Sequence, residues 1–201
     1  MPQRGLYTLP PLPYGYNDLV PFLSEEQLKI HHDKHHTAYV TEANNILEKL
    51  DKARKQNTQL DMKGVLKSLS FNIGGHILHS MFWSNLIPIN KAKKEPGGHL
   101  LESLKKEFGN FARFRDEFSL CAASIEGSGW AALTYCTQTG KMIPMQIEKH
   151  NTNLYPTFRI LMVLDMFEHA YYIDYKNEKK KYVKGFWNVI NWEEVSRRLE
   201  D

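Results

Sequence analysis

The sequence predicts an α+β fold that is mostly helical, with an antiparallel helical hairpin followed by a small three-stranded antiparallel sheet. Two long segments with helical periodicity come before residue 87, whereas the segments rich in strand-forming residues all follow residue 129. Between them, Pro88 to Gly98 (PINKAKKEPGG) has the composition of a linker. We therefore expect an N-terminal helical-hairpin domain over residues 1–90 and a C-terminal α/β domain over residues 91–201.

The composition excludes several classes of protein. A hydrophobic content of 42% in 201 residues is enough for a packed core, so extensive disorder is not expected. The net charge of +3 is small, and the lysine clusters lack the arginines and interleaved aromatics of a nucleic-acid surface. Cys121 and Cys136 have no CxxC spacing, which argues against a disulfide framework or a zinc knuckle.

The N-terminal residues carry no targeting pattern. Residues 1–4 lead into a proline-rich segment and not into an apolar signal core, and no apolar run approaches the length of a membrane span. We expect a soluble cytoplasmic protein. The proline-rich segment, residues 7–21, should form an extended arm on the surface of the fold, because proline fixes φ and removes hydrogen-bond donors.

The first long helix should begin after Ser24 and run to about Lys55. Ser24 to Gln27 (SEEQ) has the form of a capping box, with serine at the cap and glutamine three residues later. Within this helix His31, His35 and Tyr39 recur at intervals of four residues, which places them along one stripe. Four histidines in six residues (HHDKHH) favour a chelating column over an amphipathic helix with chance histidines.

The second helix is expected from about Met62 to Leu86. Gly74 and Gly75 in its middle weaken a helix by roughly 1 kcal/mol each relative to alanine, which indicates that another group approaches the backbone closely there. Antiparallel packing of the two helices would bring His31 and His79 together.

The C-terminal part should contain helices over residues 100–108 and 111–126, and then three strands. The strands are expected at residues 130–137, 141–148 and 158–164, with helices from about Ala170. Asp165 then lies at the end of the third strand and His169 in the turn or helix that follows.

The predicted helices and strand can therefore bring three imidazoles and one carboxylate to one site: His31, His79, His169 and Asp165. Such nitrogen and oxygen ligands suit Fe, Mn, Zn or Ni and are poor for Mg or Ca. The HExxH motif of zinc hydrolases is missing, and so are the paired Glu and ExxH motifs of di-iron bundles. A single metal ion with an open coordination position is the leading interpretation, with a hydrolytic metalloenzyme as a weaker alternative.

Four segments, in order along nearly the whole chain, carry a resemblance to a known family: HHDKHHTAYV from His31, HILHSMFW from His76, DMFEHAYYIDY from Asp165 and KGFWNVINW from Lys184. The chain resembles the iron/manganese superoxide dismutases, in particular their archaeal-type branch. The resemblance implies that His31, His79, Asp165 and His169 bind one metal ion between the two domains. That ion would cycle between +3 and +2 and convert superoxide to O2 and H2O2. Iron is favoured, manganese or the use of either metal stays open, and a non-catalytic metal-binding homologue is the alternative.

The resemblance also implies roles for residues around the metal ligands. His35 and Tyr39 would guard the substrate funnel and relay protons. Glu168 would cross a dimer interface to the partner's His169, and Tyr172 would reach the partner's His35. A homodimer is expected, and members of this branch are often tetrameric. The remaining histidines, His32, His36, His76 and His99, are expected to be structural or exposed.

Two positions depart from the common family pattern. Many members place a glutamine against the metal-bound solvent, either at the position of Gly75 or from the sheet. Here the sheet stretch offers His150, as in the archaeal-type branch, with Gln146 and Asn153 as alternatives. Phe167 stands where the family often has tryptophan, which keeps an apolar cover but removes an indole N–H donor.

Overall fold

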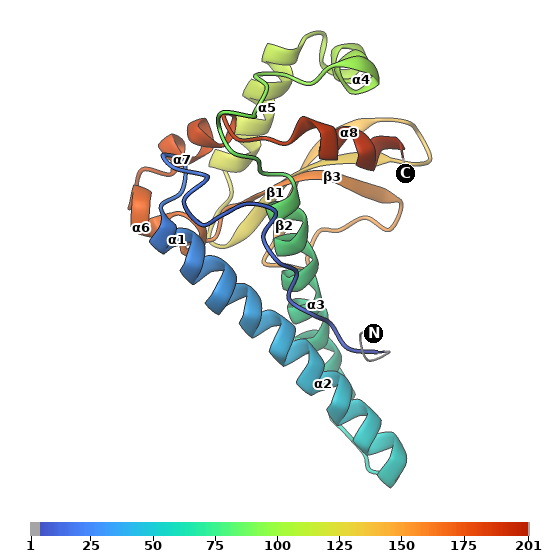
Figure 1. Ribbon diagram of the computed structural model, residues 1–201. Coiled ribbons are helices and arrows are strands. Elements are labelled where there is room, and N and C mark those ends of the chain that lie inside the picture. The colour runs from blue at the N-terminus through green and yellow to red at the C-terminus, as the bar shows by residue number, and fades with distance from the viewer. Residues whose placement is uncertain (1–4, 201) are drawn as a thin grey trace.

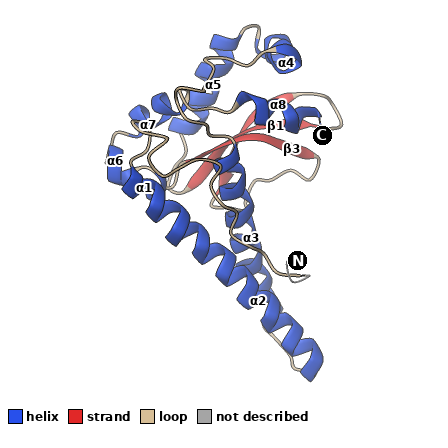
Figure 2. Ribbon diagram, viewed as in Figure 1, coloured by secondary structure: helices blue, strands red, loops and turns tan. Residues whose placement is uncertain are grey.

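A computed structural model of the chain describes residues 5–200, so the expectation about a leader at residues 1–4 lies outside the described residues. Two long helical arms form a hairpin that projects from a body built of a small sheet and shorter helices (Figures 1 and 2). The expected fold class, a helical hairpin followed by an α/β part, is confirmed. No helix within residues 5–200 is both long and apolar enough to cross a membrane.

The first arm is a continuous helical run with one irregular turn. It consists of α1 (Glu25–Ile30), a π-helical segment (His31–His36) and α2 (Thr37–Gln56). In the π-helical segment the Thr37 N–H bonds to the His32 carbonyl five residues back, so the turn holds one residue more than an α-helical turn. The second arm is α3 (Met62–Ser84), which Asp61 caps at its N-terminus.

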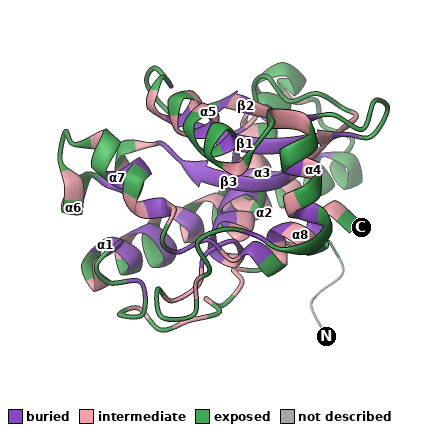
Figure 3. Cartoon of the chain, turned by 90° about the horizontal axis from the view of Figure 1, so that it is seen from above, coloured by how far each residue is buried: buried purple, intermediate pink, exposed green. Residues whose placement is uncertain are grey.

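The C-terminal part begins with α4 (Gly98–Phe108) and α5 (Phe111–Ala123). Strands β1 (Gly129–Cys136), β2 (Met142–Glu148) and β3 (Phe158–Asp165) follow and form an antiparallel sheet in the order β2-β1-β3. Helix α5 packs against β1 and β2, while α3 packs against β3. The buried strands lie between these helices (Figure 3). In this register Trp130 of β1 pairs with Asp165 of β3.

The chain returns to helices after β3. A single 3-10 turn (Glu168–Ala170) is followed by α6 (Tyr172–Tyr175), α7 (Lys179–Phe186) and α8 (Trp192–Glu200). Arg198 links helix α8 to the rest of the molecule, because its buried guanidinium donates hydrogen bonds to the carbonyls of Leu161 and Met81. The end of α8 is therefore tied both to β3 and to the end of α3.

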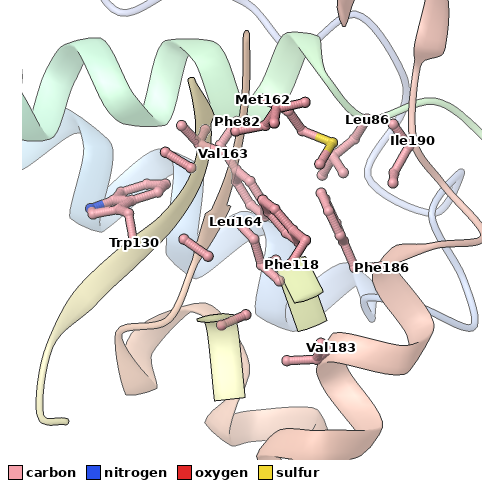
Figure 4. Packing of buried hydrophobic residues seen from close by; sticks show 14 of the residues in the cluster. Phe82, Leu86, Phe118, Trp130, Met162, Val163, Leu164, Val183, Phe186 and Ile190 are labelled. Carbon is pink, nitrogen blue, oxygen red and sulfur yellow. The ribbon is translucent and has the colours of Figure 1, made fainter. Parts of the chain in front are cut away.

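One large hydrophobic core joins the hairpin to the sheet, as Figure 4 shows from close by. Phe82 of α3 lies against Trp130 of β1, and Phe118 of α5 stacks with Phe186 of α7. A second, much smaller cluster of Ile46, Leu50 and Val65 lies farther along the hairpin.

The N-terminal arm differs from the expectation of a surface segment in its second half. Residues 16–22 form turns, and Leu19 is fully buried in the main core together with Phe22. Their apolar side chains explain the difference, because the prolines restrict the backbone without preventing its leucine and phenylalanine from packing.

Candidate metal centre

Four side chains converge on one buried point where the hairpin meets the sheet. The Nε2 atoms of His31, His169 and His79 lie 3.0, 3.1 and 3.5 Å from Oδ2 of Asp165. The offered ligand atoms of all four residues lie within 4.8 Å of one another. They come from the π-helical segment, the 3-10 turn, α3 and the end of β3, which are the four positions that the sequence singled out.

Local bonds aim two of these side chains. Nδ1 of His79 lies 2.6 Å from the Gly75 carbonyl of its own helix, so it donates its proton there and leaves the lone pair of Nε2 free. Oδ1 of Asp165 accepts from the Phe167 N–H at 2.9 Å, which leaves Oδ2 facing the imidazoles. The donor atoms are therefore oriented by the chain itself.

The electrostatics of the cluster suit a cation. Burial lowers the pKa of His31 to about 4 and holds the pKa of His79 well below its usual value, in both cases against the attraction of Asp165. Burial alone would raise the pKa of Asp165, but the neighbouring imidazoles of His169 and His31 reverse this and hold it well below its ordinary range. His31 and His79 are thus neutral beside an ionised carboxylate, and their short contacts with Asp165 are not ion pairs.

The arrangement fits a single metal ion. Nε2 of His79 is fully buried and has no hydrogen-bond partner among the described residues, as expected for a nitrogen that keeps its lone pair for a ligand bond. Two ligands at about 2.1 Å from one ion and 90–120° apart are roughly 3.0–3.6 Å from each other. The three contacts to Asp165 Oδ2 fall in this interval. Three imidazoles and one carboxylate are also a donor set that iron and manganese accept.

His150 lies beside the four-residue cluster. The indole N–H of Trp130 donates to His150 Nδ1 at 3.0 Å, which fixes the proton of the neutral ring on Nε2. That Nε2 is buried without a partner among the described residues, and the ring lies 5.8 Å from the His79 ring.

The two alternatives to His150 have other partners. The amide of Gln146 donates to the Cys121 carbonyl and to Ser124 at the end of α5, and Asn153 donates to the exposed Glu148. Of the three candidates that the sequence left open, His150 is the one that the fold brings to the cluster.

Phe167 lies inside a column of four stacked rings. Its ring is 4.3 Å from that of His150 and 4.9 Å from that of His169, and His169 in turn stacks on His35 at 4.4 Å. The angles between successive ring planes are 3°, 17° and 27°. The expected apolar cover is therefore also a spacer that holds the imidazoles of His150 and His169 apart.

The chelating column expected along His31, His35 and Tyr39 is wrong, because only His31 belongs to the four-residue cluster. The ring of His35 stacks on His169, and the ring of Tyr39 lies 5.1 Å from His79. The π-helical segment widens the turn between His31 and Thr37, so the i, i+4 stripe of a regular α-helix does not continue through it.

The glycine pair of α3 makes room for Tyr39 and His150 beside the cluster. A Cβ atom on Gly75 would lie 2.8 Å from the ring of Tyr39, and one on Gly74 would lie 2.2 Å from the backbone oxygen of His150. The expected close approach is confirmed. It lets α3 press against both α2 and the loop after β2.

Tyr39 connects the cluster to the surface. Its ring lies 4.6 Å from that of His150, and it also borders a surface hollow of about 610 Å³ whose rim includes Lys34 and Glu42. Burial raises the pKa of Tyr39, so its hydroxyl keeps its proton near neutral pH. A larger groove of about 690 Å³ between α5 and α7 contains none of the clustered side chains.

The sequence patterns did not predict two groups of contacts near the cluster. Trp83 donates to Nδ1 of His36, and Nε2 of His36 lies 2.9 Å from Nδ1 of His76, so two histidines expected to be structural form a network beside the His79 ring.

The second group of contacts involves Gln27, whose side-chain amide bonds to the carbonyl of His169. The capping box is thus half formed: Ser24 caps the helix, but its own N–H bonds to Asp174 and not to Gln27.

Comparison with known proteins gives two family matches that together span most of the chain. Residues 6–87 match the model of the alpha-hairpin domain of iron/manganese superoxide dismutases, and residues 96–198 match the model of their C-terminal domain. A protein of Methanothermobacter marburgensis named superoxide dismutase [Fe] is 55% identical over 99% of this chain and 98% of its own length.

Relatives with other metals in their names are also similar. A superoxide dismutase [Mn/Fe] of Aeropyrum pernix is 44% identical over 96% of this chain and 91% of its own length. A superoxide dismutase [Mn] of Mycobacterium leprae is 44% identical over 96% of this chain and 92% of its own length.

Proposed function

The chain belongs to the iron/manganese superoxide dismutase family, and from this we propose that it disproportionates superoxide to O2 and H2O2 at the cluster of His31, His79, Asp165 and His169. The observation that carries the proposal is the convergence of three imidazole Nε2 atoms on one carboxylate oxygen in a buried site. These four side chains would hold the metal ion.

Iron is the favoured metal and manganese the alternative, because similar relatives are named for Fe, for Mn/Fe and for Mn. A metal ion held by these four residues would supply the redox chemistry, because iron and manganese are both stable in the +3 and +2 states. The protein's own task is to admit the anion, to place hydrogen-bond donors beside it and to deliver the two protons that the formation of H2O2 consumes.

His150 supplies the inner donor in this proposal. Because Trp130 occupies Nδ1, the ring presents a buried N–H at Nε2 beside the cluster, where it can donate to an oxygen atom of solvent or substrate. Such donors tune a metal site by favouring one protonation state of the neighbouring oxygen. The stack on Phe167 keeps the ring from tilting away.

His35 and Tyr39 supply the outer proton path. Tyr39 lies between the His150 ring and the surface hollow, and its hydroxyl stays protonated, so it can pass a proton inward and regain one from water. His35 is half-buried and stacked on His169.

The site is completed by a second copy of the chain. Glu168 and Tyr172 are exposed on the segment that carries His169, and His169 is the one clustered residue whose side chain is partly exposed, at 13%. We place Glu168 against the partner's His169 and Tyr172 against the partner's His35, with tetramers as pairs of such dimers. The Glu168→Ala variant should then dissociate at higher concentration than the parent in sedimentation, and an unchanged dimer would contradict this interface.

A cytoplasmic location belongs to the same proposal, with an antioxidant role. Both cysteines, Cys121 and Cys136, are free, as is typical of proteins in a reducing compartment.

Metal reconstitution tests the function. Metal-free protein is loaded separately with Fe, Mn or Zn, its metal content is measured, and superoxide consumption is followed. We expect activity with Fe, lower or equal activity with Mn, and none with Zn, which has no redox chemistry. Stoichiometric Fe and Mn forms that are both inactive would favour the non-catalytic metal-binding alternative, and ester or peptide hydrolysis by the Zn form would favour a hydrolase.

A further inference from the structure

Gln27 is a fully buried amide that joins the first helix to the segment carrying His169. Its Nε2 donates to the His169 carbonyl at 2.6 Å, and its Oε1 accepts from the Ile173 N–H at 3.2 Å. Both backbone groups lie more than 140 positions away in the sequence. One side chain therefore bonds to a carbonyl in the 3-10 turn and to an amide in α6.

His169 depends on outside support more than the other clustered residues. His79 is fixed by a bond to its own helix, and Asp165 ends a strand of the sheet. His169 lies in a single 3-10 turn between β3 and the four-residue helix α6. Such a short segment has few internal hydrogen bonds, so its position is set by what it touches.

His31 follows Gln27 by four residues in the same continuous helical run, and its N–H bonds to the Gln27 carbonyl. Residues four apart on a helix lie on the same face. The amide that clamps the His169 backbone thus belongs to the same rigid element as another clustered imidazole, and the rings of His31 and His169 are 4.9 Å apart. Two further contacts fasten the same segments: Ser24 N–H to Asp174 at 2.7 Å, and the Tyr175 hydroxyl to the Phe22 carbonyl at 2.7 Å.

We propose that Gln27 is a positioning residue of the metal centre, which sets the spacing between the ligands His31 and His169 by clamping the backbone of His169 to the helix that bears His31. The inference rests on the proposed function, since it takes His31 and His169 as metal ligands. It assigns to Gln27 no contact with the metal or with substrate.

The test compares two amides that make the same kind of contact. Asn44 of α2 also bonds to both backbone groups of a distant residue, the N–H of Tyr7 at 2.8 Å and its carbonyl at 2.9 Å. Gln27→Met and Asn44→Leu each replace an amide with an apolar side chain of similar size. Both variants are loaded with iron, and the release of iron to a chelator, the electron paramagnetic resonance spectrum of the ferric protein and hydrogen exchange at the Ile173 amide are measured.

Loss of an outer partner of a metal ligand typically reduces metal affinity by about 10–100-fold. We expect Gln27→Met to release iron faster by roughly that factor, to change the ferric spectrum and to lose protection at Ile173, while Asn44→Leu matches the parent in all three measurements. Equal release rates and spectra for Gln27→Met and the parent would overturn the inference. Equal acceleration in both variants would overturn it too, because that indicates general loosening.

A second variant covers the case in which Gln27→Met does not fold. Gln27→Glu keeps the size and the oxygen that faces Ile173, and replaces only the donor to His169 with an acceptor. It should also speed iron release and change the ferric spectrum, and parent-like behaviour would overturn the inference. If the parent protein itself did not retain Fe or Mn, that result would contradict the proposed metal site, and it is distinguishable from a failure of the inference about Gln27.

Discussion

The two halves of the helical hairpin share a secondary structure but differ in what they contact. The half next to the sheet carries His31, His79 and the glycine pair, and it packs into the main core through Leu78, Phe82 and Trp83. The far half projects into solvent (Figure 1), and its own core is the small cluster around Leu50. The near half also contacts β3, the 3-10 turn and α6, whereas in the far half each helix packs mainly against the other.

This contrast indicates which positions of the hairpin tolerate substitution. In the near half a Cβ atom at Gly74 would meet backbone, which cannot move without displacing the loop after β2. In the far half a Cβ atom at Gly64 would meet the end of the Asp61 side chain, which can rotate away. The same substitution should therefore have different consequences in the two halves.

The largest effect should follow from the loss of a ligand in the near half. His79→Ala removes one of the four donor atoms, and we expect the variant to lose stoichiometric metal and, with it, superoxide consumption. Metal analysis of purified protein measures this, with the exposed His99→Ala as a control that should retain both. Full metal occupancy in His79→Ala would show that the ligand set is misassigned, and Asp165→Ala would then be the next variant to examine.

Gly74→Ala should be the most destabilising of the glycine changes. The added methyl would overlap the backbone oxygen of His150, and we expect the free energy of unfolding to fall by about 3 kcal/mol. The matched change, Gly64→Ala, gains roughly 1 kcal/mol of helix propensity and weakens the Asp61 cap by a similar amount, so its net effect should stay within about 1 kcal/mol. Urea denaturation of the two variants compares them directly, and equal stabilities would refute the contrast between the halves.

Leu50→Ala tests the small core of the far half. Burial of Leu50 predicts a loss of about 2 kcal/mol, at the lower end for a buried leucine because the cluster is small and borders solvent. Metal retention should not change, since the cluster has no contact with the ligands. Faster metal release in this variant would show that the far half supports the site after all.

Tyr39→Phe tests the outer part of the site with little effect on stability. The variant should keep its metal and lower turnover by about tenfold, with a changed pH profile, because one proton donor of the path is lost while the ring still fills the space beside Gly75. Stopped-flow assays over a range of pH measure both quantities. Parent-like turnover at every pH would remove Tyr39 from the proton path.

The smallest effect concerns attraction of the substrate. The net charge of +3 predicts that kcat/KM falls by about two- to threefold between low salt and 0.5 M ionic strength, a value estimated from the screening length. Lys34 is the cation on the rim of the hollow beside Tyr39, where Asp33 and Glu42 oppose it. Lys34→Gln should reduce this dependence. A kcat/KM that does not respond to ionic strength would exclude steering.

The sequence was sufficient for the fold class and for the four clustered residues. The capping serine, the adjacent glycines within a helical pattern and the apolar third strand are local sequence patterns, so they can be recognised before the fold is known. The contacts of Gln27 and the packing of Leu19 could not be predicted in this way, because they depend on segments that meet only in the folded chain. The π-helical segment was also missed, since HHDKHH is compatible with a regular helix until its hydrogen bonds are known.

The wider turn at residues 31–36 also limits how this chain can change in length. One residue corresponds to a rotation of about 100° around a helix axis. Because the π-helical segment already holds one extra residue, deleting one residue there would leave an α-helical turn and keep α2 nearly in place. Deleting or inserting a residue in the regular helix between this segment and Tyr39 would turn the rest of α2 by that angle, and the phenol would leave its place beside His150. Changes in length should be tolerated at the bend between the two arms, near Asn57.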